Sequence, residues 1–216
     1  MTGELLLIDK PAGITSHDVV DRVRRIKNTR RVGHAGTLDP FATGLLIVGV
    51  GPATKELTAL VGLDKTYMAT ARLGATSTTD DPEGEIVECV GADQCVRPGT
   101  KSQEEVLRAL ESFRGTYTQT TPAFSAKKVG GKKMYELARK GLADTVVRPT
   151  KEVTIRDIKL IKYDWPNLEF EVSCSSGTYI RAIARDLGDR LGCGAYLTQL
   201  RRTRIGPYRI EDAQVL

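Results

Sequence analysis

Cysteine, histidine and aromatic residues are scarce in this sequence, and their scarcity excludes several kinds of site. The 216 residues include four cysteines, two histidines and one tryptophan. The cysteines form no Cys-x-x-Cys pair, and only His17 and His34 are available to complete a zinc site. We therefore predict no metal site. Scattered cysteines of this kind are typical of small buried residues in a reducing compartment, which favours a cytoplasmic protein.

Long apolar runs are also missing. The run from Leu45 to Val50 is far shorter than the roughly 20 residues that a membrane helix needs, and it predicts a buried strand instead. The first apolar run, from Leu5 to Ile8, has neither the preceding basic region nor the apolar length of a signal peptide. We therefore expect neither a membrane partner nor export.

What is present is an ordinary globular composition with a basic excess. Hydrophobic residues make up 40% and charged residues 27%, and the formal net charge is +5. Such a balance allows a sizeable core and a polyanionic partner, because basic surfaces displace counterions from phosphates. The basic residues cluster in three places: Arg22 to Arg31; Lys127, Lys128, Lys132, Lys133, Arg139 and Lys140; and Arg201, Arg202 and Arg204. Each cluster is equally compatible with a merely solvated face.

The order of the predicted elements favours a mixed fold. We predict strands over 5–9, 45–50, 66–73, 153–161, 168–173 and 195–205, and helices that begin with Ser16 as the N-cap, at a Ser102 capping box, near Met134 and at Tyr179. Residues 28–44 are glycine-rich and polar, which predicts an extended loop. Residues 120–148 are interpreted as an insertion. Without regular β-α-β spacing or a linker, the chain is predicted to be a single α+β domain over 1–216, with a mixed, mostly antiparallel sheet.

One carboxylate stands out within the loop that precedes the 45–50 strand. Asp39 lies in the segment Gly33-His34-Ala35-Gly36-Thr37-Leu38-Asp39-Pro40-Phe41-Ala42-Thr43-Gly44. A glycine-punctuated loop before a buried strand is a suitable position for a nucleophile. The residue types fit an alternative equally well, in which Asp39 caps a short helix with Pro40 at its first position.

Three further residues have both a functional and an ordinary interpretation. His34 could contact RNA, but a lone loop histidine more often satisfies backbone groups. Tyr67 could support a base, but a tyrosine in an alternating strand is usually part of the core. Arg181, in Ser176-Gly177-Thr178-Tyr179-Ile180-Arg181, could pair with a catalytic carboxylate or make a surface salt bridge with Asp186 or another acid.

Several motifs together resemble one family. Asp9-Lys10-Pro11-x-Gly13-x-Thr15-Ser16 and the Gly33 to Gly44 segment resemble the TruB family of tRNA pseudouridine synthases. Further blocks follow in the family order: Lys65-x-Tyr67 with Leu73-Gly74, Thr121-Pro122-x-x-Ser125-Ala126-x-Lys128, Tyr135-x-x-Ala138-Arg139-x-Gly141, and Gly177-Thr178-Tyr179-Ile180-Arg181 with Asp186-Leu187-Gly188. The resemblance covers nearly the whole chain, and several blocks in register make coincidence implausible.

The resemblance implies a pseudouridine synthase-like fold and a cofactor-independent isomerisation of the T-loop uridine at position 55 of tRNA. It implies that Asp39 is the catalytic aspartate, that Tyr67 packs against the target base and that Arg181 pairs with Asp39. His34, Tyr179 and Leu200 match positions that line the uridine site or its RNA surroundings. The RNA contacts that we expect come from basic side chains: Lys10, Lys65, Lys127, Lys128, Lys132, Lys133, Arg139 and Arg202.

The sequence departs from the family pattern in two places. Ser77-Thr78-Thr79 replaces a Thr-Asp-Thr-like pattern, which we expect to affect a loop and not the chemistry. We also expect the chain to lack the PUA-type RNA-binding extension that is common in the family. Two other functions are alternatives to this enzyme: a non-enzymatic RNA-folding module and an RNA-guided synthase subunit. We expect instead a monomer that binds the tRNA T-arm without a guide RNA.

Overall fold

The computed structural model describes residues 3–89, 101–125, 127–138 and 146–215, and its contacts divide the chain into two compact units. Unit 1 comprises 1–68, 171–176 and 199–216, and unit 2 comprises 69–170 and 177–198. Each unit is assembled from segments that are distant in sequence, so no linker marks the division. None of the helices in the described ranges is long and apolar enough to cross a membrane.

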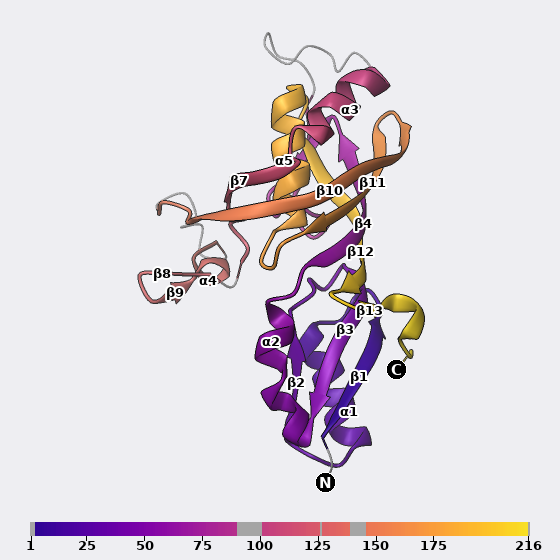
Figure 1. The fold of residues 1–216 in the computed structure, drawn as a ribbon. Helices are drawn as coiled ribbons and strands as arrows, with labels where there is room; N and C mark the ends of the chain where they lie inside the picture. The colour runs from indigo at the N-terminus through magenta and orange to yellow at the C-terminus, as the bar shows by residue number, and fades with distance from the viewer. Residues whose placement is uncertain (1–2, 90–100, 126, 139–145, 216) are drawn as a thin grey trace. The chain divides into compact units, whose positions relative to one another are not determined.

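Unit 1 is built on three strands near the N-terminus (Figure 1). Its elements are β1 (Glu4–Lys10), α1 (Ser16–Ile26), β2 (Val32–Ala35), β3 (Thr43–Val50), the 3-10 helix η1 (Gly51–Lys55), α2 (Leu57–Val61), β13 (Tyr208–Arg209) and the 3-10 helix η3 (Ile210–Asp212). Strand β1 pairs antiparallel with one edge of β3. The other edge pairs with β2 through 47–50 and, in parallel, with β12 (Ala195–Ile205) through 43–44.

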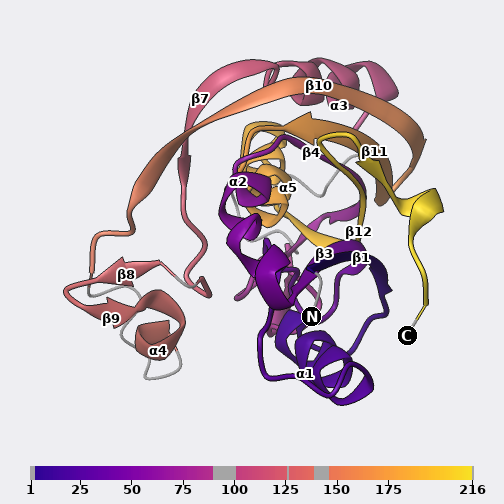
Figure 2. The same ribbon diagram turned by 60° about the horizontal axis from the view of Figure 1, so that its bottom comes forward.

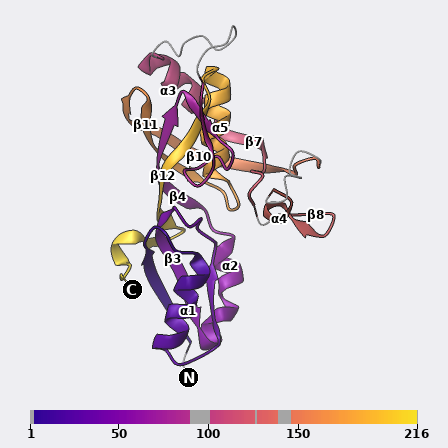
Figure 3. The same ribbon diagram turned by 180° about the vertical axis from the view of Figure 1, so that it is seen from behind.

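Alternation along β1 and β3 produces two apolar faces in unit 1. Ile8, Leu46 and Val48 pack with Val19, Val20 and Val23 of α1, which lies against the strands as Figure 3 shows. The opposite side chains, Leu45 and Ile47 among them, pack with Leu57 of α2 and Ile205 of β12. Each fully buried aliphatic side chain contributes about 1.5–3 kcal/mol of stability, so these faces fix the strand register.

Unit 2 carries the long antiparallel ribbon and the remaining helices. Its elements are β5 (Ala75–Ser77), β6 (Ile86–Glu88), α3 (Gln103–Glu111), β7 (Gly115–Thr120), β8 (Lys128–Val129), β9 (Lys132–Lys133), α4 (Met134–Ala138), β10 (Thr150–Asp164) and α5 (Ile180–Leu191). Strands β4 (Lys65–Leu73), β11 (Asn167–Cys174) and β12 contribute residues to both units. The strand order β4-β11-β10-β7 places β7 at the sheet edge.

The predicted insertion begins and ends where β7 meets β10. Thr120 pairs with Thr150, and the Thr121 N–H donates to the Pro149 carbonyl at 3.0 Å, which closes the neck of the segment. Beyond the neck, β8 and β9 form a hairpin whose Gly130 and Gly131 both have positive φ, as a two-residue turn of this kind requires. Figure 2 shows β7 and β10 running together toward this hairpin and α4.

The fold class is confirmed, while two local predictions were wrong. The N-cap of α1 is Thr15, not Ser16, because the Thr15 hydroxyl and the Asp18 carboxylate form a reciprocal capping box. The segment 28–44 is not one continuous loop, since residues 32–35 form β2. A four-residue strand in a glycine-rich segment has no strong sequence pattern of its own, and only its pairing with β3 specifies it.

Candidate active site

Asp39 lies between β2 and β3, in a loop that makes a tight turn. The Ala42 N–H donates to the Asp39 carbonyl at 3.1 Å, and residues 39–42 form no helix. The alternative in which Asp39 caps a helix is therefore excluded. Its side chain is only partly buried, while Leu38 and Ala42 on either side are core residues.

Ser16, the first residue of α1, fixes the backbone immediately before Asp39. The buried Ser16 hydroxyl accepts the Leu38 N–H at 2.8 Å and lies 3.2 Å from the Leu38 carbonyl, to which it donates. Because one hydroxyl satisfies both backbone groups of Leu38, the position of the loop is tied to the start of the helix.

Lys10 fixes the backbone immediately after Asp39. Its Nζ donates to the carbonyls of Pro11, Ile14 and Pro40 at 2.8, 2.7 and 3.2 Å, and the Gly13 N–H also donates to Pro40, at 2.9 Å. Lys10 has no exposed surface. This burial contradicts the prediction that Lys10 binds RNA, because an ammonium group enclosed by three carbonyls does not reach a phosphate.

Arg202 fixes both ends of the same loop. Its Nε donates to the Leu45 carbonyl at 2.7 Å, and its two terminal nitrogens donate to the carbonyls of Thr37 and Gly36 at 3.4 and 3.0 Å. The side chain is 1% exposed. The expectation that Arg202 contacts RNA directly is thus contradicted as well.

Lys65 is the third basic residue whose expected RNA contact is contradicted by its burial. It is 6% exposed, and its Nζ donates to the Val61 and Leu63 carbonyls at 2.8 and 2.5 Å. Its aliphatic stem lies near Gly36, since a methyl group added at the Gly36 Cα would be 3.7 Å from the Lys65 Cε. Lys65 therefore binds carbonyls at the C-terminal end of α2, and its stem lies beside Gly36 of the Asp39 loop.

Tyr67 of β4 lies near Asp39 and Arg202 within unit 1. Burial raises the pKa of the Tyr67 phenol, the Arg202 guanidinium lowers it through its charge and a hydrogen bond, and the Asp39 carboxylate raises it. The phenol therefore stays protonated at physiological pH. Two of the predicted site residues, Asp39 and Tyr67, are thus brought together, and the ring is 7% exposed.

His34 and Leu200 belong to the same unit. His34 lies on β2, where burial lowers its imidazole pKa and the charge of Arg202 lowers it further. Its Nδ1 is buried and has no hydrogen-bond partner among the described residues. Leu200 on β12 is 7% exposed, and its carbonyl lies 3.5 Å from the Thr43 hydroxyl at the start of β3.

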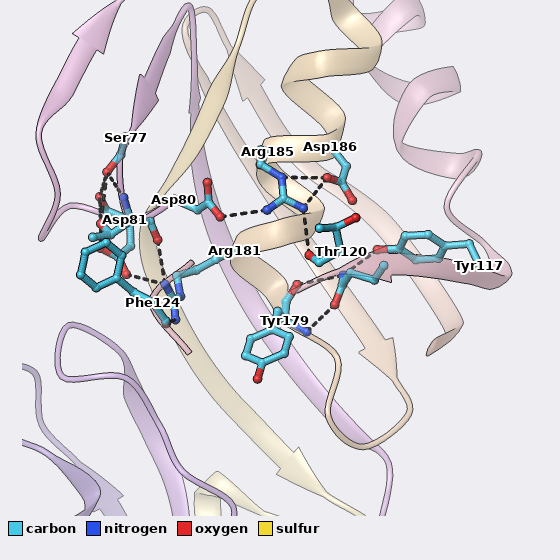
Figure 4. A network of polar contacts seen from close by, with 12 residues as sticks. Ser77, Asp80, Asp81, Tyr117, Thr120, Phe124, Tyr179, Arg181, Arg185 and Asp186 are labelled. Atoms are coloured by element: carbon cyan, nitrogen blue, oxygen red, sulfur yellow. Dashed lines mark hydrogen bonds and ion pairs between the residues drawn. The ribbon is translucent and has the colours of Figure 1, made fainter. Parts of the chain in front are cut away.

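Arg181 of α5 is the centre of a separate polar network in unit 2 (Figure 4). Its NH1 lies 3.2 Å from the Asp81 carboxylate and donates to the Thr79 carbonyl at 2.7 Å, and its NH2 donates to the Phe124 carbonyl at 3.0 Å. Both charged side chains are about 5% exposed or less. Of the alternatives that the sequence offered, Asp186 pairs with Arg185, and the acid beside Arg181 is Asp81, in a buried pair and not a surface one.

Arg185, one turn after Arg181, links Asp80 of the 77–81 segment to Thr120, where the predicted insertion begins. It lies 3.1 Å from the Asp80 carboxylate and 2.8 Å from that of Asp186, and it donates to the Thr120 carbonyl at 3.1 Å. Burial raises the pKa of both carboxyl groups, and the Arg185 charge opposes that rise. The 77–81 loop, where the sequence departs from the family pattern, thus anchors the helix that carries Arg181.

Tyr179 is positioned by a buried glutamine that the sequence did not single out. The Gln119 side chain accepts the Tyr179 N–H at 2.8 Å and donates to the Tyr179 carbonyl at 3.1 Å and to the Tyr117 hydroxyl at 2.7 Å (Figure 4). Gln119 is 1% exposed and lies on β7, at the neck of the insertion. This role of Gln119 becomes apparent only from its long-range hydrogen bonds with the Tyr179 backbone.

The basic residues of the insertion are described only in part. Lys127 is exposed, while the backbones of Lys128, Lys132 and Lys133 form the β8–β9 hairpin. Arg139 lies outside the described residues. Within the described part of the chain, no group of three or more His, Cys, Asp or Glu side chains is arranged to hold a metal ion.

Comparison with known families accounts for most of the chain. A model described as "TruB family pseudouridylate synthase (N terminal domain)" matches residues 24–180. A second, described as "tRNA pseudouridylate synthase B C-terminal domain", matches residues 181–216. The two matches meet at Arg181 and together cover nearly all of the sequence.

Curated relatives and solved structures agree with these matches. A tRNA pseudouridine synthase B from Leifsonia xyli is 50% identical over 216 residues, which cover 98% of this chain and 70% of the relative. One from Thermobifida fusca is 48% identical, with 100% of this chain and 74% of the relative covered. A Cbf5-Nop10-Gar1 complex contains a similar chain with a TM-score of 0.75 and 28% identity; the match covers 98% of this chain and 52% of that one, so this chain spans about half of it. The chain therefore belongs to the TruB family of tRNA pseudouridine synthases, isomerases that convert uridine in tRNA to pseudouridine.

Proposed function

We propose that Asp39 is the catalytic carboxylate and that the substrate is the T-loop uridine at position 55 of tRNA. The observation that carries this proposal is the fixing of the Asp39 backbone on both sides, by Ser16 at Leu38 and by Lys10 at Pro40, beside the phenol of Tyr67. A carboxylate must be held in place to react efficiently, because a misplacement of about 1 Å can cost a factor of about 100 in rate.

The proposed reaction needs no atoms from a cofactor. The bond between the base nitrogen N1 and the sugar carbon C1′ breaks, the base rotates, and a bond forms between C5 and C1′. The proton that leaves C5 is balanced by the proton that N1 gains. Asp39 either attacks C1′ to form a covalent intermediate or assists removal of the proton from C5.

The other residues of the proposed site bind and orient the base. A uridine in a folded loop must leave its stack, and packing on Tyr67 recovers about 1–3 kcal/mol. His34, Tyr179 and Leu200 would line the uridine site. Arg181 would pair with Asp39, and the contacts of Arg181 with Asp81, Thr79 and Phe124 support a fixed position for its guanidinium.

The insertion would hold phosphates of the T-arm through Lys127, Lys128, Lys132, Lys133 and Arg139. Basic side chains around a folded RNA loop give recognition by shape together with a few base contacts.

We infer a cytoplasmic monomer that acts without a guide RNA. The identity of 50% to a tRNA pseudouridine synthase B, against 28% to a chain from a Cbf5-Nop10-Gar1 complex, supports this choice over an RNA-guided subunit.

Mapping pseudouridine at single-nucleotide resolution tests the proposed substrate. The protein is incubated with an unmodified tRNA transcript and no guide RNA, beside a transcript in which the T-loop uridine is replaced by cytidine. We expect one new pseudouridine, in the T-loop of the first transcript alone. Product at a different position would refute the substrate assignment, and binding without product would favour the RNA-folding alternative.

A further inference from the structure

Arg202 is placed as a part of the active-site loop, although it is distant from Asp39 in sequence. It extends from β12, and its three donating nitrogens contact carbonyls at Gly36 and Thr37 before Asp39 and at Leu45 after it. One planar side chain therefore spans both ends of the loop. A guanidinium group is suited to this because its donors point in fixed directions.

The contact between the loop and Arg202 is too close to tolerate a side chain at Gly44. Gly44 pairs with Arg202, has a φ of +104°, and a Cβ at this position would lie 2.3 Å from the Arg202 carbonyl oxygen. Gly36 has a φ of +90°. The loop thus returns to β12 at a fixed point, so the Arg202 side chain and backbone together set where the loop begins and ends.

The same guanidinium also lies beside Tyr67. It lowers the phenol pKa through its charge and a hydrogen bond, against the larger effect of burial. Arg202 is therefore shared between the loop that carries Asp39 and the aromatic ring proposed to support the base. Burying a cation is costly unless its hydrogen bonds are satisfied, and three backbone carbonyls accept hydrogen bonds from Arg202 here.

We infer that Arg202 is a positioning residue for the reaction, which holds the Asp39 loop and the Tyr67 ring in one fixed arrangement. This inference rests on the proposed role of Asp39. It replaces the direct RNA contact that the sequence suggested, since a side chain that is 1% exposed and directed at carbonyls has no surface to offer a phosphate.

Single-turnover kinetics of two variants test the inference. Arg202→Met removes the charge and the donors, and Arg202→Lys keeps the charge and most of the volume but offers one point of attachment in place of a fork. With enzyme in excess over unmodified tRNA, we expect the rate at saturation to fall about 100-fold in Arg202→Lys and further in Arg202→Met. The dissociation constant for tRNA should change by less than about threefold.

Two controls separate the positioning role from a general loss of stability and from the effect of replacing any arginine of this strand by lysine. Val106→Ala removes core volume beneath α3 in unit 2 and should lower stability while the rate of the folded enzyme is retained. Arg204→Lys alters an exposed arginine of the same strand and should also retain the rate. Rates are compared at a temperature at which near-ultraviolet circular dichroism shows each variant to be folded, and Arg202→Lys suffices if Arg202→Met does not fold.

Each outcome decides between the alternatives. A rate for Arg202→Lys within threefold of the parent overturns the inference, and so does a loss that appears entirely in the dissociation constant, which would restore the RNA contact. Asp39→Asn is measured in parallel. If Asp39→Asn keeps its activity, the proposed function itself fails; if it is inactive while Arg202→Lys is fully active, only the role of Arg202 is refuted.

Discussion

Asp39 owes its position to residues that the sequence presents as unrelated to it. Ser16 lies in a helix, Lys10 at the end of a strand and Arg202 near the other end of the chain, yet each donates to or accepts from the backbone between Gly36 and Leu45. At the scale of single residues, the site is a set of backbone anchors around one carboxylate.

Lys10 is expected to contribute to stability and not to RNA affinity. Lys10→Met leaves the carbonyls of Pro11, Ile14 and Pro40 without their buried donor, which should cost about 2–4 kcal/mol of unfolding free energy. Urea denaturation measures this loss. The dependence of tRNA affinity on salt should stay as in the parent.

The exposed Lys127 is the matched comparison for Lys10. Lys127→Gln should leave stability nearly unchanged and reduce the slope of log affinity against log salt by about 1, as expected for one lost phosphate contact. If instead Lys10→Met lowers the slope and Lys127→Gln does not, the buried and exposed lysines have been assigned the wrong roles.

His34 should make stability depend on pH. Its pKa in the folded protein is lowered from 6.5, mainly by burial, so the unfolded chain binds a proton more readily than the folded one. The stability that His34 contributes is therefore present above about pH 6.5 and is lost as pH falls through the folded pKa. With only two histidines in the chain, NMR titration can follow the imidazole directly after His17→Gln.

His34→Gln supplies the control for this pH effect. It should flatten the decrease in urea midpoint between about pH 7.5 and 5.5 that the parent shows. An imidazole of His34 that titrates at or above 6.5, or a variant with the same pH dependence as the parent, would show that burial does not govern this group.

At the scale of elements, α1 serves as a support for the loop through its first residue. Ser16→Ala leaves the buried Leu38 N–H unpaired, and we expect a loss of about 1–3 kcal/mol in stability together with an approximately tenfold lower single-turnover rate. Ser102→Ala, which removes the N-cap of α3 in unit 2, should cost about 1 kcal/mol without lowering the rate. Equal rate losses in the two variants would refute the specific link between α1 and the loop.

Elements with a local signal were predictable from the sequence, and those that depend on pairing were not. The capping box of Ser102 and Glu105 specifies the start of α3 by itself, and the alternation from Lys65 to Leu73 specifies β4. For α1, the sequence predicted Ser16 as the cap, but the cap is the adjacent Thr15, which has Asp18 three residues after it. Strand β2 depends on its pairing with β3, a long-range contact that no local pattern contains.

For the site, sequence identified the residue types but not their burial. The motif around Asp39 pointed to the loop, and Tyr67 lies close to it as expected. Charge alone, however, made Lys10, Lys65 and Arg202 look like RNA contacts, because a sequence does not distinguish a buried cation that binds carbonyls from an exposed one. Gln119, a polar strand residue without a motif, was missed for the same reason.

At the scale of the whole molecule, the excess positive charge should attract RNA through the exposed basic residues only, because some basic side chains are buried and hydrogen-bonded to carbonyls. The formal net charge is +5, yet three of the basic residues assigned to RNA from the sequence are buried. The exposed Lys127 lies on the segment between β7 and β10 that is predicted to be an insertion. Arg181 and Arg185 contact backbone at or near that neck, which ties α5 to the base of the insertion.

The most direct test of the central claim is the turnover of Asp39→Asn on unmodified tRNA, measured with enzyme in excess and no guide RNA. The substitution removes the charge and nearly preserves the size. The account predicts that no pseudouridine forms in the T-loop while the dissociation constant for tRNA stays within about threefold of the parent. Pseudouridine formation at the parental rate would contradict the assignment of Asp39 as the catalytic carboxylate.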